Sequence, residues 1–247
     1  MSSVDTKTRK EREIAEREQR ILMIAREQII ADGYLGMNMD RIAKALEYSK
    51  GTIYNHFSCK EEIVIALAVE TMEKRVELFR KAAQFTGPSR ERMAAIGVAA
   101  GLFVELFRDH FTFEQILRID SVWEKTTEKR RNVIRGCEEK CMGVVGGIVR
   151  DAVASREISM PDGVTPEDLV FGLWAMTLGT YAITTTSDSL TALGVKDPQG
   201  TMNHHIDLIL DGYHWQPLSS EHASAEVRDR VKKEVFADEF RALANQS

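Results

Sequence analysis

The sequence predicts an all-α protein with a small N-terminal helix-turn-helix domain and a larger helical C-terminal domain. Apolar residues recur at helical spacing along most of the 247 residues, and no strong strand alternation occurs. Glycine and proline, as in Gly87-Pro88, separate these segments. Residues 38–60, NMDRIAKALEYSKGTIYNHFSCK, have the pattern of two short helices joined by a tight turn.

The helical pattern defines each expected element in turn. The first helix carries an apolar stripe that includes Ile14 and Ile21, and Gly33 ends it. After Pro217, apolar residues from Val227 to Leu243 predict one more amphipathic helix. The expected helices outside the short pair cover about 9–31, 61–84, 89–108, 111–126, 128–155, 166–186 and 199–213. The expected domains are 1–60, then 61–217 with 61–84 as a linking helix, and an extension over 218–247.

The pair of short helices in 38–60 is capped and one-sided. Asn38 and Ser49 are good N-cap residues for the first and the second helix. The positions expected to be buried are Ile42, Ala43, Leu46, Ile53 and Phe57. At about 100° per residue, positions 51 and 55 then lie opposite Ile53. The second helix therefore has a face that is free to contact another molecule.

That outward face has the side chains that DNA recognition needs. Gly51 would let a groove wall come close, and Thr52 and Asn55 can hydrogen-bond base edges. Tyr54, His56 and Lys60 suit phosphate oxygens. The full set of expected DNA contacts is Asn38, Ser49, Lys50, Gly51, Thr52, Tyr54, Asn55, His56 and Lys60. By spacing alone, a solvated helix pair in an ordinary helical protein explains the same residues equally well.

A specific resemblance favours DNA binding. The string IAKALEYSKGTIYNHFSCKEEI resembles the DNA-binding domain of the tetracycline-repressor (TetR) family, and the resemblance covers about residues 15–70. Two positions depart from the family pattern. Asn38 stands where threonine is usual, and both residues cap helices. Glu47 stands where glycine is usual in the turn, so the turn is either right-handed or strained by roughly 1 kcal/mol.

The resemblance implies a ligand-responsive regulator, most often a repressor. Proteins of this family are all-helical homodimers whose variable C-terminal domain binds a small molecule, and binding re-spaces the two recognition helices so that the dimer leaves a palindromic operator. The helices expected at 166–186 and 199–213 match the dimerising helices in order and position. An activator of the same fold, or a helical protein-interaction module that does not bind DNA, are the alternatives.

The effector is indicated only by bulky apolar side chains on the central helices, because such residues line most ligand sites. They predict a small, apolar or aromatic compound. The candidates are Phe103, Phe107, Phe113, Ile116, Trp123, Met142, Trp174 and Met176.

Charge and composition fit this assignment. The net charge is −5, but residues 1–60 hold 11 Lys and Arg against 9 Asp and Glu, which leaves the negative excess in the remainder. The N-terminus lacks a secretory pattern, and three cysteines fit a reducing compartment, so a cytoplasmic protein is expected. The uncharged stretch 169–187 is interpreted as a core or interface helix rather than a membrane span.

Other chemistries have weaker support. Cys137 and Cys141 share a helix face, yet a metal site needs more ligands than their neighbours offer. His204, His205 and His214 favour packing or capping over metal binding. Hydrolase, zinc-protease, di-iron and phosphate-loop motifs do not occur in the sequence. We therefore expect no enzyme, no cofactor and no metal.

Overall fold

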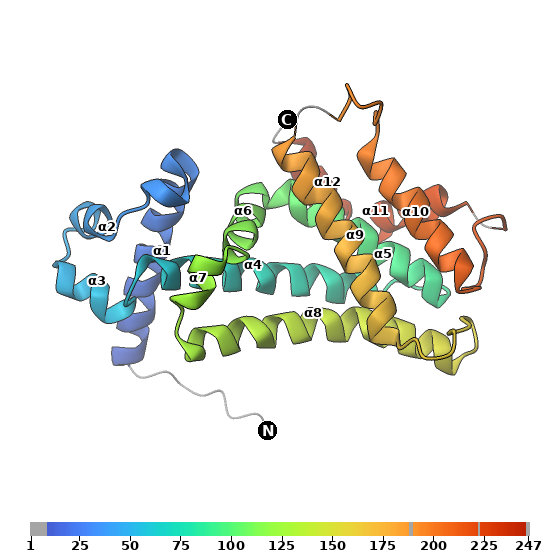
Figure 1. Cartoon of the computed structure of the whole chain (residues 1–247), viewed down its shortest axis with the longest axis horizontal. Coiled ribbons are helices and arrows are strands. Elements are labelled where there is room, and N and C mark those ends of the chain that lie inside the picture. The colour runs from blue at the N-terminus through green and yellow to red at the C-terminus, as the bar shows by residue number, and fades with distance from the viewer. Residues whose placement is uncertain (1–8, 188–189, 222, 246–247) are drawn as a thin grey trace. The chain divides into compact units, whose positions relative to one another are not determined.

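The computed structural model describes residues 9–187, 190–221 and 223–245, and every regular element within them is an α-helix (Figure 1). The all-α prediction is confirmed. The first eight and the last two residues, which belong to the expected first domain and to the expected extension, lie outside the described ranges. The chain forms two compact units: unit 1 is Met1–Thr71 with Asp109–Arg135, and unit 2 is Met72–Arg108 with Gly136–Ser247.

Unit 1 joins the N-terminal helices to a segment from the middle of the chain. Its helices are α1 (Arg9–Gly36), α2 (Met39–Ala45), α3 (Lys50–His56), the first part of α4 (Lys60–Ala83), most of α6 (Arg108–Leu117), α7 (Asp120–Glu124) and the start of α8 (Glu128–Ala154). Their apolar faces form one core. It includes Ile21, Ile42, Ile53, Phe57, Ile63, Phe113, Ile116 and Val122. Residues far apart in the sequence therefore bury each other here.

Two helix boundaries in unit 1 differ from the expected ones. Gly33, with φ 71°, interrupts α1 as its sequence position indicated, but the element continues to Gly36. The helix expected over 111–126 is two helices, because Ile119 is extended with φ −80° and ψ 121°. The break lets Val122 of α7 enter the same core as Phe113 of α6.

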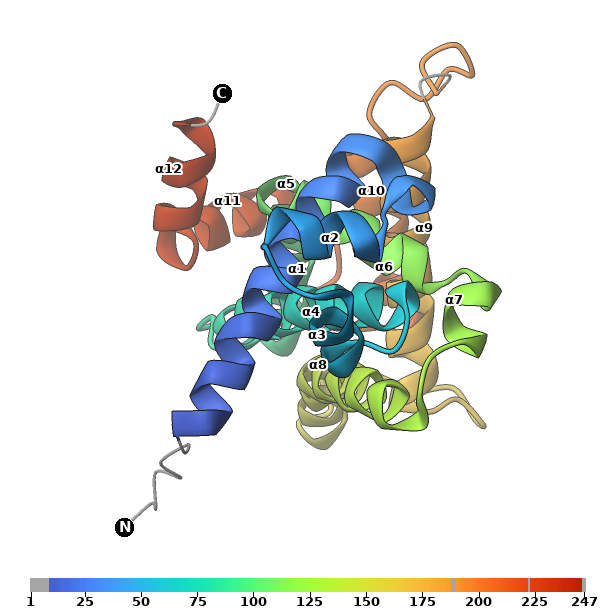
Figure 2. The same cartoon turned by 90° about the vertical axis from the view of Figure 1, so that its left-hand side faces the viewer.

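Unit 2 contains α5 (Ser89–Leu106), α9 (Pro166–Thr186), α10 (Pro198–Gly212), α11 (Ser224–Glu234) and α12 (Ala237–Ala244), with the remainders of α4 and α8. α11 and α12 lie beside α5 (Figure 2). One amphipathic helix was expected in the extension, and the structure has two. Phe236 is fully buried at the break between them, so the chain turns where this large apolar side chain packs.

A buried arginine ties α5 to the end of α10. Arg90 is 1% exposed, and its Nη1 donates to Asp211 Oδ1 and to the Trp215 carbonyl, both at 2.6 Å. Trp215 Nε1 donates in turn to Ser89 Oγ at 2.7 Å. A guanidinium buried at a helix C-terminus is favourable when its donors meet carbonyl and carboxylate oxygens. These bonds fix α10 on α5.

α9 is an apolar helix with an uncovered side. Thr165 and Asp168 form a capping box at its start, and Pro166 occupies the first turn. Its length and hydropathy would suit a membrane span. Only 22% of its most apolar window is buried within the chain. A buried core helix would be covered on all sides, so α9 does not have the burial of one.

The turn between α2 and α3 is left-handed. Glu47 has φ 55°, its N–H bonds to the Lys44 carbonyl at 3.2 Å, and the Tyr48 N–H bonds to the Ala43 carbonyl at 2.9 Å. This is the pattern of a helix that ends in a Schellman motif, in which glycine is the usual residue at the left-handed position. Of the two turn conformations that the sequence left open, the strained one occurs.

Replacing Glu47 by glycine should therefore stabilise the protein. We expect Glu47→Gly to raise the free energy of unfolding by about 1 kcal/mol, because glycine adopts positive φ without steric cost. Lys44→Gly, three residues earlier and inside α2, should lower it by up to about 1 kcal/mol. Urea unfolding of both variants measures the difference, and equal losses for the two would show that the turn at Glu47 carries no strain.

Candidate nucleic-acid interface

α3 buries one side and exposes the other, as its sequence indicated. Ser49 caps its start by accepting a hydrogen bond from the Thr52 N–H at 3.1 Å. Ile53 and Phe57 are fully buried. On the opposite side Gly51, Tyr54 and Asn55 are exposed, and a Cβ at Gly51 would meet only Ser49 Oγ within 4 Å. This face is the part of unit 1 best suited to enter a groove of DNA.

Several expected DNA contacts also have structural partners. The Asn38 side chain caps α2 by accepting from the Asp40 N–H at 2.8 Å. The hydroxyls of Ser49 and Thr52 lie 2.8 Å apart. Lys50 Nζ donates to Asp40 Oδ2 at 2.6 Å, although 69% of the lysine side chain is exposed. Ion pairs this exposed are weak, so a phosphate could replace Asp40 as the partner of Lys50.

Lys60 and Tyr34 pack together where α1 ends and α4 begins. The Lys60 ammonium lies 4.4 Å from the centre of the Tyr34 ring and 3.5 Å from the Tyr34 carbonyl oxygen. The Tyr34 hydroxyl donates to Glu61 Oε1 at 3.1 Å. Burial and this bond to Glu61 raise the pKa of the Tyr34 phenol. The tyrosine therefore stays neutral and acts as a donor.

The first turn of α4 holds two buried carboxylates. Glu61 is 4% exposed and Glu62 6% exposed. Burial raises the pKa of Glu61, but hydrogen bonds from its own backbone N–H, Tyr34 and Lys125 outweigh burial and lower it. Burial likewise raises the pKa of Glu62, and bonds from the Ser58 N–H and from Thr127 bring it below its usual value. Both groups are therefore ionised at neutral pH, at a helix end that favours negative charge.

Lys125, Thr127 and Arg130 contact the end of α3 and the start of α4, and the sequence did not indicate these contacts. They lie between α7 and the first turn of α8, more than sixty positions after the turn that they contact. Their local pattern is that of an ordinary charged helix start. Only the tertiary fold brings them to α3 and α4, so no sequence signal identified them.

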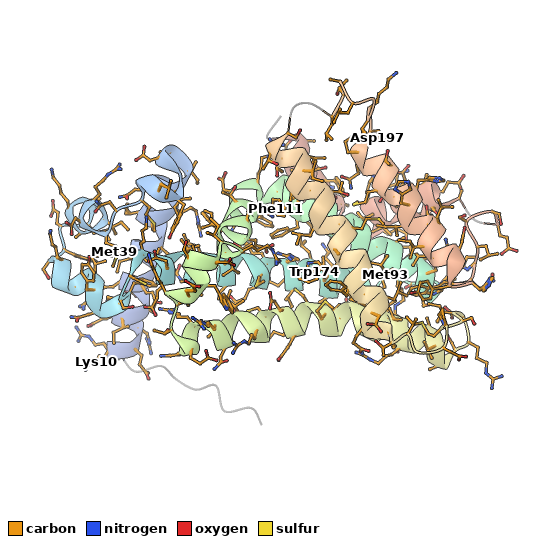
Figure 3. All side chains as sticks on the ribbon, viewed as in Figure 1. Lys10, Met39, Met93, Phe111, Trp174 and Asp197 are labelled. Atoms are coloured by element: carbon orange, nitrogen blue, oxygen red, sulfur yellow. The ribbon has the colours of Figure 1, made fainter. Side chains whose placement is uncertain are left out.

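The candidate ligand-lining residues divide between the two units. Phe103 of α5, the α5 C-cap residue Phe107, Met142 of α8, and Trp174 and Met176 of α9 belong to unit 2, and Trp174 is labelled in Figure 3. The Phe103 and Phe107 ring centres lie 5.7 Å apart. Phe113, Ile116 and Trp123 belong to unit 1, where Phe113 and Ile116 are part of the core around α3.

The cysteines and carboxylates of unit 2 form no evident metal site. Burial raises the pKa of both Cys137 and Cys141. Cys137 lines a cleft with charged walls, together with Glu73, Val76, Glu77, Arg80 and Lys140. In the part of the chain that the structure describes, three or more metal-binding side chains do not cluster.

Comparisons with known proteins agree with this geometry. The family model for bacterial regulatory proteins of the tetR family matches residues 21–67, which include α2, α3 and the start of α4. A fatty acid metabolism regulator protein of Bacillus subtilis is 25% identical over 196 residues, which are 78% of this chain and 94% of that protein. The HTH-type transcriptional activator FasR of Mycolicibacterium smegmatis is 33% identical over 90 residues, which are 36% of this chain and 41% of the FasR chain.

A solved structure shows the same fold. The transcriptional regulator FadR from Bacillus subtilis, solved in complex with stearoyl-CoA, matches with a TM-score of 0.58 and 19% identity, over 79% of this chain and 99% of that one. Together with the exposed face of α3, these comparisons show that residues 21–67 match the DNA-binding domain of bacterial regulatory proteins of the tetR family, and that the chain is similar to transcriptional regulators of that family.

Proposed function

We propose that this chain is a cytoplasmic transcriptional repressor that binds a palindromic operator as a homodimer and is released from it by a long-chain acyl thioester. The observation that carries the proposal is the exposed face of α3, opposite its buried Ile53 and Phe57. A short helix held this way can place its side chains in the major groove.

The side chains of this face would have separate roles on DNA. Asn55 and Thr52 would hydrogen-bond base edges, while Gly51 allows close approach. Tyr54 is 51% exposed and, with His56, would reach phosphate oxygens. Lys50 would exchange its exposed pair with Asp40 for a phosphate. Three further residues would hold the ends of the helices in place and contact the DNA phosphate backbone: Asn38, Ser49 and Lys60.

The uncovered sides of α9 and α10 support a homodimer. The two helices pack against each other, yet Phe171 and Ile183 of α9 and Leu208 of α10 are each more than half exposed. A Cβ at Gly172 or Gly179 would meet nothing within 4 Å inside the chain. An apolar surface with room for close approach is what a second copy would cover, and it would pair two recognition helices.

An acyl thioester fits the apolar class of effector that the sequence indicated. The Bacillus subtilis relative is named for fatty acid metabolism, and the FadR structure holds stearoyl-CoA. In unit 2 the Lys74 ammonium and the Arg75 guanidinium each lie 4.8 Å from an aromatic ring centre, over Phe107 and Phe103 respectively. Cations beside aromatic rings suit a ligand with an apolar chain and an anionic head.

Activation is the second candidate output, because the FasR relative is named as an activator. The DNA-binding unit would be the same, and the two outputs differ in where the operator lies relative to the promoter. We place repression first, as the resemblance indicated. In either case α4 would carry the ligand signal, since it is one continuous helix with residues in both units.

The operator can be identified by selection from a random duplex library with the full-length protein. We expect an inverted repeat whose half-site centres lie about 10 base pairs apart or a multiple of that. Asn55→Ala should weaken operator binding about tenfold and change binding to a scrambled duplex little, because it removes a base contact. Asn132→Ala, an exposed asparagine of α8, is the matched control.

Two results would contradict this part of the proposal. A selected site without two-fold symmetry would exclude the homodimer on DNA. Binding of a duplex releases counterions, so affinity for DNA should decrease as salt rises from low to moderate concentration. An affinity that stays constant would favour the protein-interaction alternative.

The effector class can be tested on the same operator complex. Stearoyl-CoA should release the protein at micromolar concentration, whereas coenzyme A alone should leave the complex intact, because the acyl chain supplies the apolar contacts. Fluorescence anisotropy of the labelled duplex measures the release. Equal release by coenzyme A alone, or tighter binding with stearoyl-CoA, would refute an acyl-thioester inducer while leaving operator recognition intact.

A further inference from the structure

The connection from α7 to α8 lies against the turn that follows α3. Cys59 Sγ is 3.6 Å from the Lys125 carbonyl oxygen, and Lys125 Nζ donates to Glu61 Oε1 at 3.3 Å. Thr127 hydrogen-bonds Glu62, which also accepts from the Ser58 N–H at 3.0 Å. Several independent contacts therefore join the two segments, and all of them lie within unit 1.

Arg130 extends this connection to α3 itself. Its guanidinium lies 5.0 Å from the centre of the Phe57 ring, and Phe57 is the fully buried C-cap residue of α3. Arg130 Nη2 also donates to Glu18 Oε1 of α1 at 2.9 Å. The Arg130 side chain, which is 26% exposed, thus contacts both the C-cap residue of α3 and a residue of α1.

We propose that Arg130 is a positioning residue for DNA recognition, which sets the direction of α3 by packing on Phe57 and pairing with Glu18. α3 has only seven residues, so its direction depends on what fixes its two ends. Ser49 caps the first end through local bonds. At the other end the backbone N–H of the C-cap residue Phe57 bonds to the Ile53 carbonyl, and Arg130 lies over the Phe57 ring.

The consequence for recognition follows from hydrogen-bond geometry. Bonds from Asn55 and Thr52 to base edges weaken steeply when distance or angle departs from its optimum. A small rotation of α3 about its capped end would move these side chains out of register with the bases. Contacts to phosphates tolerate such a rotation better, since they depend mainly on charge. Loss of Arg130 should therefore reduce specific binding more than non-specific binding.

The test measures affinity of full-length variants for the selected operator and for a scrambled duplex, each over a series of salt concentrations. Arg130→Gln should weaken operator binding about tenfold, with scrambled binding and the salt dependence of both unchanged. Arg135→Gln is the matched control. It removes the same charge from α8, but its partners are Glu128 at 2.6 Å and Asn132 at 2.7 Å, both on α8 itself, and it should leave both affinities unchanged.

Glu18→Gln is the second variant, because Arg130→Gln could fail to fold. It removes the α1 partner while leaving Arg130 on Phe57, and it should weaken operator binding a few-fold with the same selectivity. Equal weakening on both duplexes by Arg130→Gln, with a salt slope smaller by about one, would show a direct phosphate contact and overturn the proposal. Unchanged operator affinity in the folded variants would overturn it as well.

The positioning role of Arg130 rests on the proposed operator binding, yet the two can fail separately. The selection of a symmetric operator by the wild-type protein and its release by stearoyl-CoA do not depend on Arg130. Conversely, the affinities of the Arg130 variants for the operator and the scrambled duplex are measured without an effector, so they do not depend on the identity of the effector. A protein that recognises its operator but is insensitive to Arg130→Gln would refute the positioning role alone.

Discussion

The buried carboxylates of Glu61 and Glu62 at the start of α4 are the constraint on which unit 1 depends. Burying a charge is costly unless donors surround it. Here the helix N-terminus, the Tyr34 hydroxyl and the Lys125 ammonium serve Glu61, and the Ser58 N–H and Thr127 serve Glu62. Because these donors come from α1, the α3–α4 turn and the α7–α8 connection, the two carboxylates can be satisfied only when all three segments are in place.

This constraint matters because α2 and α3 are too short to be stable alone. Each has seven residues, well below the length at which an isolated helix persists in water. Their caps, Asn38 and Ser49, define where they begin, and packing of Ile42, Ile53 and Phe57 defines how they lie. The exposed face of α3 is therefore a product of the core beneath it rather than of α3 itself.

Much of this arrangement could be predicted from sequence because it is local. The caps at Asn38 and Ser49, the spacing of Ile53 and Phe57, and the apolar stretch of α9 each follow from residues within a few turns. The left-handed Glu47 could be stated only as one of two possibilities, since a single non-glycine residue does not determine φ. The break at Ile119 and the turn at Phe236 were missed, because burial of Val122 and Phe236 by distant residues decides them. The contacts of Lys125 and Arg130 with the end of α3 and the start of α4 depend on distant residues for the same reason. The sequence also could not show that Phe113 and Ile116 lie in the core of unit 1.

The ionised Glu62 carboxylate holds the turn after α3 by accepting a hydrogen bond from the Ser58 N–H. The chemical shift of the Ser58 amide therefore follows the ionisation of Glu62. In the ¹⁵N-labelled protein, the Ser58 amide shift should titrate with a midpoint below the ordinary glutamate value of about 4.3, since the folded pKa of Glu62 is lowered. The stability that this bond contributes is then present above that value and is lost as the pH falls through the folded pKa. Glu62→Gln should abolish the titration. A midpoint at or above the ordinary value, or an amide that does not respond to Glu62→Gln, would contradict this role of Glu62.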